Sequence, residues 1–366
     1  LRFGRRHHAE RAVLVARSMT ELAGAALSNS VKPVTSRSLE RVAFLFPGQG
    51  AQHVGMARDL YSAEAVFRDA LDRCAELLRP NLGLNILDVM HGPGLSEEEA
   101  AARLMDTALA QPAIFSISFA LAEQWKRWGI EPDALIGHSV GEFAAATLAG
   151  CMDLPDALRL VALRGRLISQ LPRGTMISVR ASEDEIAPFL SQGLDLAAVN
   201  GAKACVLAGP DQAVLDAMPR LEAAGFVAAK LQTSHAFHSR MMDPALAEFR
   251  AAVARTPLAA PRLPILSTVT GAWLTDAEAT DPEYWVGHMR RPVRFHDAIR
   301  RMWADGSHVL IETGPGRNLT MLAAQNPDPK MPVAVISSLP HAQAASTDSA
   351  QSMREAFGLL WAHGYP

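Results

Sequence analysis

Cysteine is scarce in this sequence: only three occur among 366 residues, and Cys74, Cys151 and Cys205 lie far apart. An odd number of widely spaced cysteines fits neither a disulfide framework nor a Cys-x-x-Cys metal site. Apolar runs approaching the roughly 18 residues of a membrane span are also lacking, and the first eight residues have no apolar signal-peptide core. These absences favour a cytoplasmic protein with no bound metal and no membrane contact.

A strong charge of one sign is missing as well, because 35 Lys and Arg residues face 38 Asp and Glu residues, for a formal net charge of -3. Nucleic-acid-binding proteins usually carry a basic field, so we expect no nucleic acid as a partner. With 49% hydrophobic and 20% charged residues, the composition is that of a globular protein. At roughly 150 residues per domain, the length fits two or three folded units. The first residue is Leu1 rather than Met, from which we expect a piece of a longer protein.

Short, wholly apolar runs predict buried strands. Residues 42–46 have the sequence Val-Ala-Phe-Leu-Phe and are followed by Pro-Gly, which is typical of a strand buried on both faces in a parallel sheet. A second run at residues 134–136 leads into Gly-His-Ser-Val-Gly and then into a helix of small residues. Further strands are expected near residues 264–269 and 308–312. This alternation of strands and helices predicts an α/β fold.

Two other stretches have distinct patterns. Apolar residues at helical spacing predict an amphipathic helix that begins with Pro112 in its first turn and ends at Gly129. From about residue 176 to residue 232 the sequence changes to short β-prone pieces around helical stretches, which predicts a small α+β insert in the larger unit.

The strand, turn and helix around Ser139 could carry chemistry. Gly137-x-Ser139-x-Gly141 has the layout of a nucleophile elbow, in which a tight turn lifts a serine hydroxyl clear of the sheet; a plain glycine-rich turn has the same five-residue pattern. Unpaired N–H groups at the start of the following helix could stabilise an oxyanion. Val140 would supply one such donor, and Gln49, in the turn after the first strand, would supply a second.

A serine nucleophile needs a base. Twelve histidines are available, and the best cluster is His235-Ala236-Phe237-His238, where the predicted insert rejoins the main sheet. The residue pattern alone does not choose between the two histidines.

Arg164 is predicted to be buried, because its neighbours three and four positions away in a helix at about residues 154–171 are all apolar: Leu160, Val161, Leu167 and Ile168. A buried guanidinium must meet an acceptor, since leaving it unpaired costs several kcal/mol. Two interpretations remain open. Arg164 forms an internal salt bridge with an Asp or Glu, or it holds a substrate carboxylate in a two-pronged contact.

Taken together, six segments resemble the acyltransferase domain of modular polyketide synthases, which is similar to the malonyl-CoA:acyl carrier protein transacylase of fatty-acid synthesis. They occur in the family's order between about residues 42 and 337: Phe46-Pro47-Gly48-Gln49-Gly50-Ala51-Gln52, Gln111-Pro112-Ala113, Gly137-His138-Ser139-Val140-Gly141-Glu142, Arg164-Gly165, His235-Ala236-Phe237-His238-Ser239 and Gly314-Pro315-Gly316.

The resemblance implies an α/β-hydrolase-like large subdomain with a parallel sheet at residues 41–175 and 235–337. A ferredoxin-like α+β small subdomain would interrupt it at residues 176–234. Flanking linker elements would complete the chain: the end of a ketosynthase-to-acyltransferase linker at residues 1–40, and a post-acyltransferase linker at residues 338–366.

The resemblance also implies roles for the matching residues. Ser139 would be the nucleophile and His238 the general base, with backbone N–H groups of Gln49 and Val140 as the oxyanion hole. A backbone carbonyl near His288 would orient His238, although related domains usually have Asn at that position. The residues expected to bind substrate are Arg164, Gln111, His235 and Phe237.

The implied reaction is a ping-pong transfer of a malonyl or substituted malonyl unit from acyl-CoA to the phosphopantetheine thiol of an acyl carrier protein, next to a ketosynthase. No cofactor would be bound. The segment His-Ala-Phe-His resembles the motif of malonyl-selective domains, whereas methylmalonyl-selective ones usually have Tyr-Ala-Ser-His. Val140, after the nucleophile, also favours malonyl selectivity.

Two rival functions stay open at this point. A serine hydrolase on a similar elbow would have an acidic triad partner and no buried arginine. A docking module without activity would lack the serine or the histidine, yet both are present.

Overall fold

The central feature of the fold is a five-stranded parallel sheet. The structure is a computed structural model, and it describes residues 8–28, 32–36, 41–92, 94–190, 193–306, 308–327, 334–340 and 348–365. The strands lie in the order β11-β10-β3-β4-β9, and every neighbouring pair is parallel. Their bounds are β3 (Val42–Phe46), β4 (Ala134–Gly137), β9 (Ile265–Leu266), β10 (Val309–Glu312) and β11 (Ala334–Ser337). The predicted α/β fold with a parallel sheet is confirmed.

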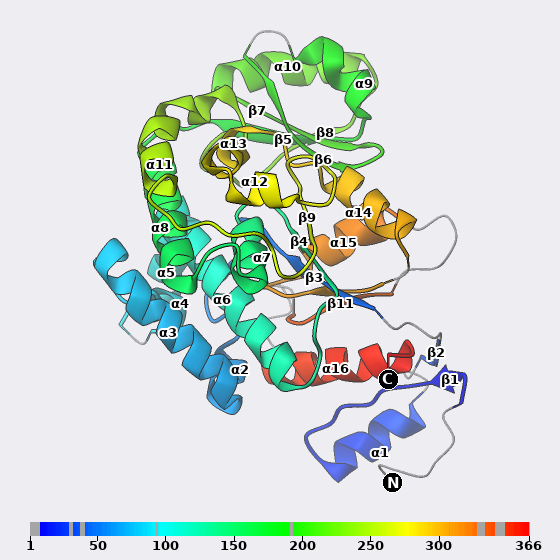
Figure 1. Cartoon of the computed structure of the whole chain (residues 1–366). Coiled ribbons are helices and arrows are strands. Elements are labelled where there is room, and N and C mark those ends of the chain that lie inside the picture. The colour runs from blue at the N-terminus through cyan, green and yellow to red at the C-terminus, as the bar shows by residue number, and fades with distance from the viewer. Residues whose placement is uncertain are drawn as a thin grey trace.

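Helices bury this sheet, which explains why its strands are apolar on both faces. All five residues of β3 are buried. Figure 1 shows α3 (Ala65–Leu82), α6 (Thr107–Arg127) and α8 (Leu154–Ser169) gathered beside the sheet, with α7 (Gly141–Ala149) between them and the strands. α16 (Ser349–Ala362) lies below β11 in that view.

The long helix α6 begins earlier than expected. It begins at Thr107 rather than at Pro112, because the side chain of Asp106 accepts a hydrogen bond from the N–H of Ala108 and caps the helix there. Pro112 therefore lies inside the helix. Its missing N–H leaves the carbonyl four residues earlier without the usual helical partner.

A second, four-stranded sheet is antiparallel, with the order β6-β7-β5-β8. Its chain order is β5 (Thr175–Val179), α9 (Glu183–Ile186), β6 (Asp195–Gly201), β7 (Ala204–Gly209), α10 (Asp211–Ala223) and β8 (Ala228–Lys230), with the short η1 (Ala187–Phe189) after α9. This β-α-β-β-α-β order is that of ferredoxin-like units. The β-prone pieces expected here are strands, while the bounds assigned to the insert, residues 176–234, stay a prediction.

The small sheet is joined to the segment around Val293 by a short backbone contact. The N–H of Val199 in β6 donates to the carbonyl of Val293, at 2.8 Å, and the N–H of Val293 donates to the carbonyl of Ala197, at 2.9 Å. The segment around Val293 thus extends the edge of the small sheet.

The remaining elements fill the faces and the ends of the molecule. They are β1 (Glu10–Arg11), α1 (Met19–Leu27), β2 (Val34–Thr35), α2 (Arg58–Ala63), α4 (Ile86–Met90), α5 (Glu97–Met105), η2 (Arg240–Ala245), α11 (Leu246–Val253), α12 (Asp276–Thr280), α13 (Pro282–Arg290), α14 (Phe295–Ala304) and α15 (Asn318–Ala324). Among the described residues, no helix alone is long and apolar enough to cross a membrane; α5 and α6 pass that test only as a pair, bent by 95°.

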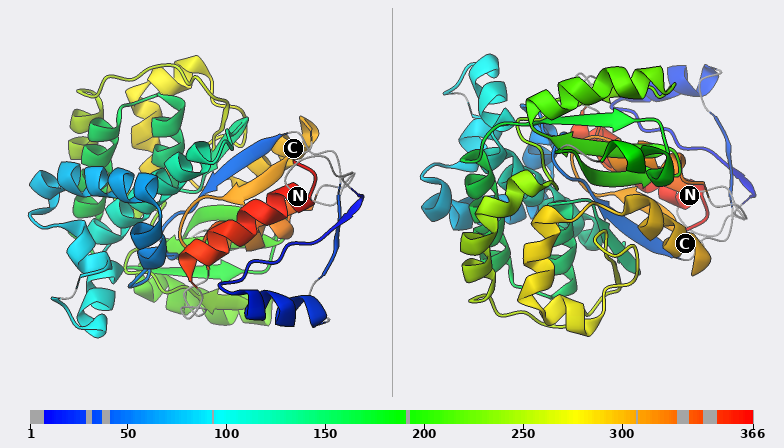
Figure 2. Two further views of the ribbon diagram at one scale, coloured as in Figure 1. Left: turned by 90° about the horizontal axis from the view of Figure 1, so that it is seen from below. Right: turned by 90° about the horizontal axis from the view of Figure 1, so that it is seen from above.

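The segment before α1 runs beside α16 (Figure 2). Arg11 donates to the carbonyl of Trp361 at 2.7 Å and lies over its ring, and Arg17 pairs with Asp348 at 3.1 Å. Of the expected linkers, residues 1–7, 29–31, 37–40, 341–347 and 366 lie outside the described residues.

The start of α7 allows a test of the packing between β3 and the elbow. A Cβ added to Gly141 would lie 2.1 Å from the carbonyl oxygen of Phe46, a backbone atom that cannot swing away. We expect Gly141→Ala to lower the free energy of unfolding by about 2 kcal/mol or more, as measured by urea unfolding. Gly24→Ala in α1, where nothing lies within 4 Å, should instead leave stability unchanged or slightly raised. Equal effects of the two variants would contradict this packing.

Candidate active site

Ser139 lies on a strained turn between β4 and α7. Its φ is 51°, in the left-handed region that residues other than glycine rarely adopt. The turn can close because Gly137 has no side chain: a Cβ there would lie 2.1 Å from the N–H nitrogen of Glu142. The predicted strand, sharp turn and helix are therefore present, and they place the serine at the carboxyl end of the parallel strands.

Ser139 and His238 are brought into hydrogen-bond contact, with 2.7 Å between Oγ and Nε2. On the other side of the ring, Nδ1 lies 2.8 Å from the carbonyl oxygen of Arg291. A carbonyl can only accept, so Nδ1 carries the proton and Nε2 is free to accept one from the serine. His238 is buried, and its φ of 57° is also in the left-handed region. The geometry is that of a serine nucleophile with a histidine base.

The prediction that the carbonyl of His288 orients His238 was wrong. The orienting carbonyl belongs to Arg291. Arg291 follows the last residue of α13, and its N–H donates to the carbonyl of Gly287 one turn earlier. Its own carbonyl has no helical partner and is free to turn toward the imidazole. The side chain of His288 contacts Glu142 instead, with 3.6 Å between Nε2 and Oε2.

Arg164 lies next to the dyad and is 2% exposed. One terminal nitrogen donates to Oε1 of Gln111, and the other lies 3.4 Å from Oγ of Ser139. The buried Nε has no partner, and no carboxylate of the described residues forms an ion pair with the guanidinium. Burial lowers the pKa of Arg164 to about 10, so the group stays charged at neutral pH. The internal salt bridge considered above is therefore not found in the described part of the chain.

A line of hydrogen bonds fixes the glutamine that meets Arg164. Nε2 of Gln111 donates to Oγ1 of Thr107 at 2.7 Å, and that hydroxyl donates to Oε1 of Gln49 at 2.8 Å. With its amide nitrogen held in this way, Gln111 presents its oxygen to the guanidinium. Thr107 was not predicted, and only its place one turn before Gln111 on the same helix could have indicated it.

These residues line one cavity of about 440 Å³ between the two sheets. Gln49, Gln111, Ser139, Val140, Arg164, Phe237 and His238 all line it, together with apolar residues of the small sheet such as Met176, Ala197, Ala198 and Val206. The turn that holds Gln49 comes close to the elbow, since a Cβ on Gly48 would lie 3.4 Å from that of Ser139. That the N–H groups of Gln49 and Val140 form an oxyanion hole stays a prediction.

His235 does not line this cavity, which corrects its expected contact with substrate. Its ring lies against Oγ of Ser234, at 2.8 Å from Nδ1, and against the carbonyl of Leu171, at 3.2 Å from Nε2. Leu171 lies two residues past the end of α8, and the contact with its carbonyl holds the imidazole of His235 outside the cavity.

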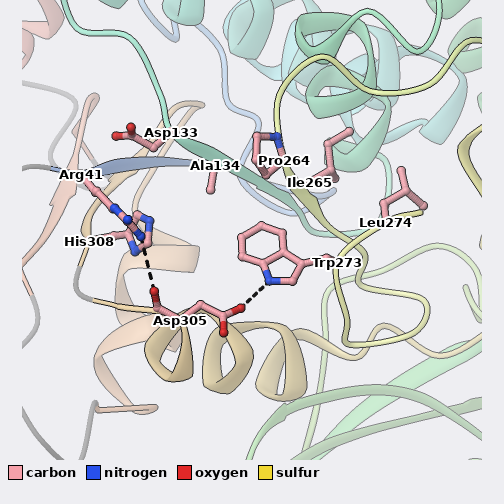
Figure 3. Close-up of a pocket in the computed structure, with 9 residues that line it drawn as sticks. All are labelled: Arg41, Asp133, Ala134, Pro264, Ile265, Trp273, Leu274, Asp305 and His308. Carbon is pink, nitrogen blue, oxygen red and sulfur yellow. Dashed lines mark hydrogen bonds between the residues drawn. The ribbon is translucent and has the colours of Figure 1, made fainter. Parts of the chain in front are cut away.

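A second cavity, of about 530 Å³, lies at the opposite ends of the same strands (Figure 3). There Trp273 donates to the carboxylate of Asp305 at 2.5 Å, and Arg41 donates to the carbonyl of the same residue at 3.4 Å. Its lining contains His308 but no serine, threonine or cysteine. Size alone therefore does not mark the reactive site. No three His, Cys, Asp or Glu side chains of the described residues gather closely enough to hold a metal ion.

A serine on an elbow, in hydrogen-bond contact with a buried histidine, defines a site for acyl chemistry through an activated hydroxyl. The chain matches the family described as "Acyl transferase domain" over residues 43–360, and it belongs to this family. The resemblance to acyltransferase domains of polyketide synthases is confirmed, and the protein is an acyltransferase. The hydrolase alternative also expected an acid at Nδ1 of His238, where a carbonyl lies.

The chain is similar to one component of the phenolphthiocerol/phthiocerol polyketide synthase of Mycobacterium tuberculosis, with 37% identity over 326 residues. The match covers 89% of this chain and 21% of that protein, so the chain spans about a fifth of the relative's length. Among solved structures it is similar to the acyl transferase domain of SpnD in complex with 2-(pent-4-yn-1-yl)malonyl, with 39% identity, 98% and 86% of the two chains covered, and a TM-score of 0.88. FabD from Acinetobacter baumannii is 25% identical, with 88% and 99% covered and a TM-score of 0.75.

The charge of Arg164 makes the pH dependence of the site testable. Burial, and then Arg164, lower the pKa of His238 well below its ordinary value, so the base stays neutral as the pH falls. Arg164→Ala should raise the pKa of His238, and the acid limb of Ser139 reactivity should then move to higher pH. The check is the rate of labelling by a serine-directed fluorophosphonate as a function of pH. Arg166→Ala, which removes an exposed arginine of the same helix paired with Glu248, should leave the profile in place. Coincident acid limbs for Arg164→Ala and the unmodified protein would contradict the electrostatic effect.

Proposed function

We propose that this acyltransferase loads a malonyl-type unit from acyl-CoA onto the phosphopantetheine thiol of an acyl carrier protein in polyketide biosynthesis, through an acyl-serine. The observation that carries the proposal is the buried guanidinium of Arg164 beside Ser139. It has no acid partner among the described residues, and its Nε has no partner. Such a charge is stabilised best by a ligand that brings its own carboxylate.

In the first half-reaction, Oγ of Ser139 attacks the thioester carbonyl while Nε2 of His238 takes the serine proton. The backbone N–H groups of Gln49 and Val140 donate to the oxyanion of the tetrahedral intermediate. The C–S bond then breaks, and the leaving thiolate of CoA receives the proton from His238. The carbonyl of Arg291 holds Nδ1–H throughout, so the imidazolium is stabilised without a third acidic residue.

In the second half-reaction the roles reverse. His238 removes the proton from the phosphopantetheine thiol, the thiolate attacks the ester, and the proton returns to Oγ of Ser139 as the C–O bond breaks. No bound cofactor is required, because CoA and the carrier protein bring and remove the acyl group. The partners are thus an acyl-CoA, an acyl carrier protein and the neighbouring domains of a larger synthase.

Arg164 supplies the selectivity for diacids. The free carboxylate of the acyl group would accept from the guanidinium, which Gln111 holds in place from the other side. An acetyl group would leave the buried charge unpaired, at a cost of several kcal/mol. The same pairing fixes the thioester carbonyl next to Ser139.

Phe237 supports a preference for malonyl over methylmalonyl. Its side chain lines the cavity and is 7% exposed, so it occupies volume that an α-methyl group would need. One methyl group contributes about 1 to 3 kcal/mol of discrimination, and some methylmalonyl transfer is therefore expected. The similar SpnD domain was solved with a substituted malonyl group, which supports a malonyl-type unit for this chain.

The flanking segments fit a place within a longer synthase. We assign residues 1–40 to the linker from a preceding ketosynthase and residues 338–366 to the post-acyltransferase linker, with the large subdomain at residues 41–175 and 235–337 and the small one at 176–234. The contacts of Arg11 and Arg17 with α16 support this assignment, because they bring the two flanking segments together.

One test distinguishes the role of Ser139 as the acylated residue from the role of Arg164 in selectivity. With radiolabelled malonyl-CoA the protein should form a stable labelled acyl-enzyme, and Ser139→Ala should abolish it. Arg164→Ala should lower malonyl labelling at least about 100-fold while labelling from acetyl-CoA is kept or raised, since only the diacid needs the cation. Equal loss of both labels would identify Arg164 as a structural residue, and label persisting in Ser139→Ala would overturn the serine assignment.

The role of Phe237 can be measured by competition. Phe237→Ser should raise the ratio of methylmalonyl to malonyl transfer about tenfold, because it restores room for a methyl group. Malonyl-, methylmalonyl- and longer alkylmalonyl-CoA are mixed, and the acyl carrier products are quantified by mass spectrometry. His235→Tyr serves as a control, because His235 does not line the cavity and the ratio should stay unchanged. An unchanged ratio in Phe237→Ser would show that other residues set the extender unit.

A further inference from the structure

The orientation of His238 depends on a backbone atom. Its Nδ1–H donates to the carbonyl of Arg291, the first residue after α13. Unlike a triad aspartate, a carbonyl has no side-chain torsion with which to adjust. Its position follows from where α13 ends, and whatever holds α13 against the elbow therefore sets the position of His238.

Glu142 holds α13 in this way. Its carboxylate is fully buried, and the two oxygens meet groups from two other segments. Tyr284 donates its hydroxyl to Oε1, and Nε2 of His288 lies 3.6 Å from Oε2. Tyr284 and His288 are one turn apart on the same face of α13. The N–H of Thr268, just beyond β9, also donates to Oε2, at 2.9 Å.

These contacts form a closed ring that includes Ser139 and His238. Ser139 precedes Glu142 by three residues on the elbow and the first turn of α7. From Glu142 the ring passes to Tyr284 and His288, along α13 to the carbonyl of Arg291, and through His238 back to Oγ of Ser139 at 2.7 Å. Moving Glu142 relative to α13 therefore changes the distance between the nucleophile and its base.

The carboxylate is charged despite its burial. Burial by itself would raise the pKa of Glu142, but His288, Tyr284 and Thr268 together outweigh it and lower that pKa. A buried anion is stable only where its acceptor positions are filled. Replacing it leaves the hydroxyl of Tyr284 and the N–H of Thr268 to compete for a weaker acceptor.

We propose that Glu142 is a positioning residue for the Ser139–His238 dyad, acting through Tyr284, His288 and the carbonyl of Arg291 rather than by touching the imidazole. This inference deepens the proposed function and rests on it for the identity of the acyl donor. In a catalytic triad the carboxylate contacts the histidine directly. Here the carboxylate of Glu142 contacts α13, and the end of α13 contacts the histidine.

The test compares two buried carboxylates. Glu312 is also fully buried and is held by the N–H groups of Leu319 and Thr320, at 3.0 and 2.7 Å, without contact to the dyad in the described residues. Glu142→Gln and Glu312→Gln are compared in thermal unfolding, in labelling of Ser139 by a fluorophosphonate, and in acylation by malonyl-CoA.

We expect both variants to lose thermal stability, and only Glu142→Gln to lose reactivity. Its fluorophosphonate labelling and its kcat for acylation should fall at least tenfold, with KM for malonyl-CoA within twofold. Glu312→Gln should label at a rate within twofold of the unmodified protein. If Glu142→Gln does not fold, Tyr284→Phe replaces it, and there both rates should fall about threefold.

The outcomes separate this inference from the proposed function. Glu142→Gln labelling as fast as Glu312→Gln would overturn the positioning role and leave a structural one, and for Tyr284→Phe the same follows from an unchanged rate. Fluorophosphonate labelling depends on the dyad and not on the acyl donor. If the unmodified protein takes no malonyl-CoA while Glu142→Gln still slows the labelling, the proposed function fails and the positioning role stands.

Discussion

The site depends on one unpaired positive charge in an apolar environment. Arg164 is held from one side by Gln111 and faces the serine oxygen on the other, with no acid of the described chain to neutralise it. Keeping a cation there is unfavourable, and the fold tolerates it because the lost hydration is partly replaced by Gln111. In the proposed function the carboxylate of the acyl group completes this environment, so that binding, orientation and selectivity follow from a single electrostatic requirement.

The same charge acts on the base. Burial, and then Arg164, lower the pKa of His238 and keep the ring neutral, while the carbonyl of Arg291 fixes its tautomer. A neutral, oriented imidazole beside a hydroxyl in a strained turn can accept a proton without an acidic triad partner. The neighbouring carboxylate of Glu142 contacts Tyr284 and His288 of α13 and does not contact the ring of His238. The position of the histidine and its protonation state thus depend on different residues.

Sequence patterns predicted the parts of this site that depend on residue type. The elbow around Ser139 follows from glycine spacing between a strand and a helix, and the burial of Arg164 follows from its apolar neighbours. The carbonyl of Arg291 could not be found in this way, because every residue has a carbonyl and only the end of α13 selects one. Likewise, spacing could not show that His235 meets the carbonyl of Leu171, or that Asp106 begins α6 before Pro112. These depend on three-dimensional packing and capping.

The backbone bonds between β6 and Val293 have a mechanical consequence. Val293 lies two residues after Arg291, so the strand whose Ala197 and Ala198 line the cavity is tied to the segment that orients the histidine. A bulky acyl branch pressing on β6 would therefore strain the proton-transfer geometry as well as fill space. The wall of the cavity at β6 and the carbonyl that orients His238 therefore belong to one backbone-linked unit, so that a substitution in β6 acts on both.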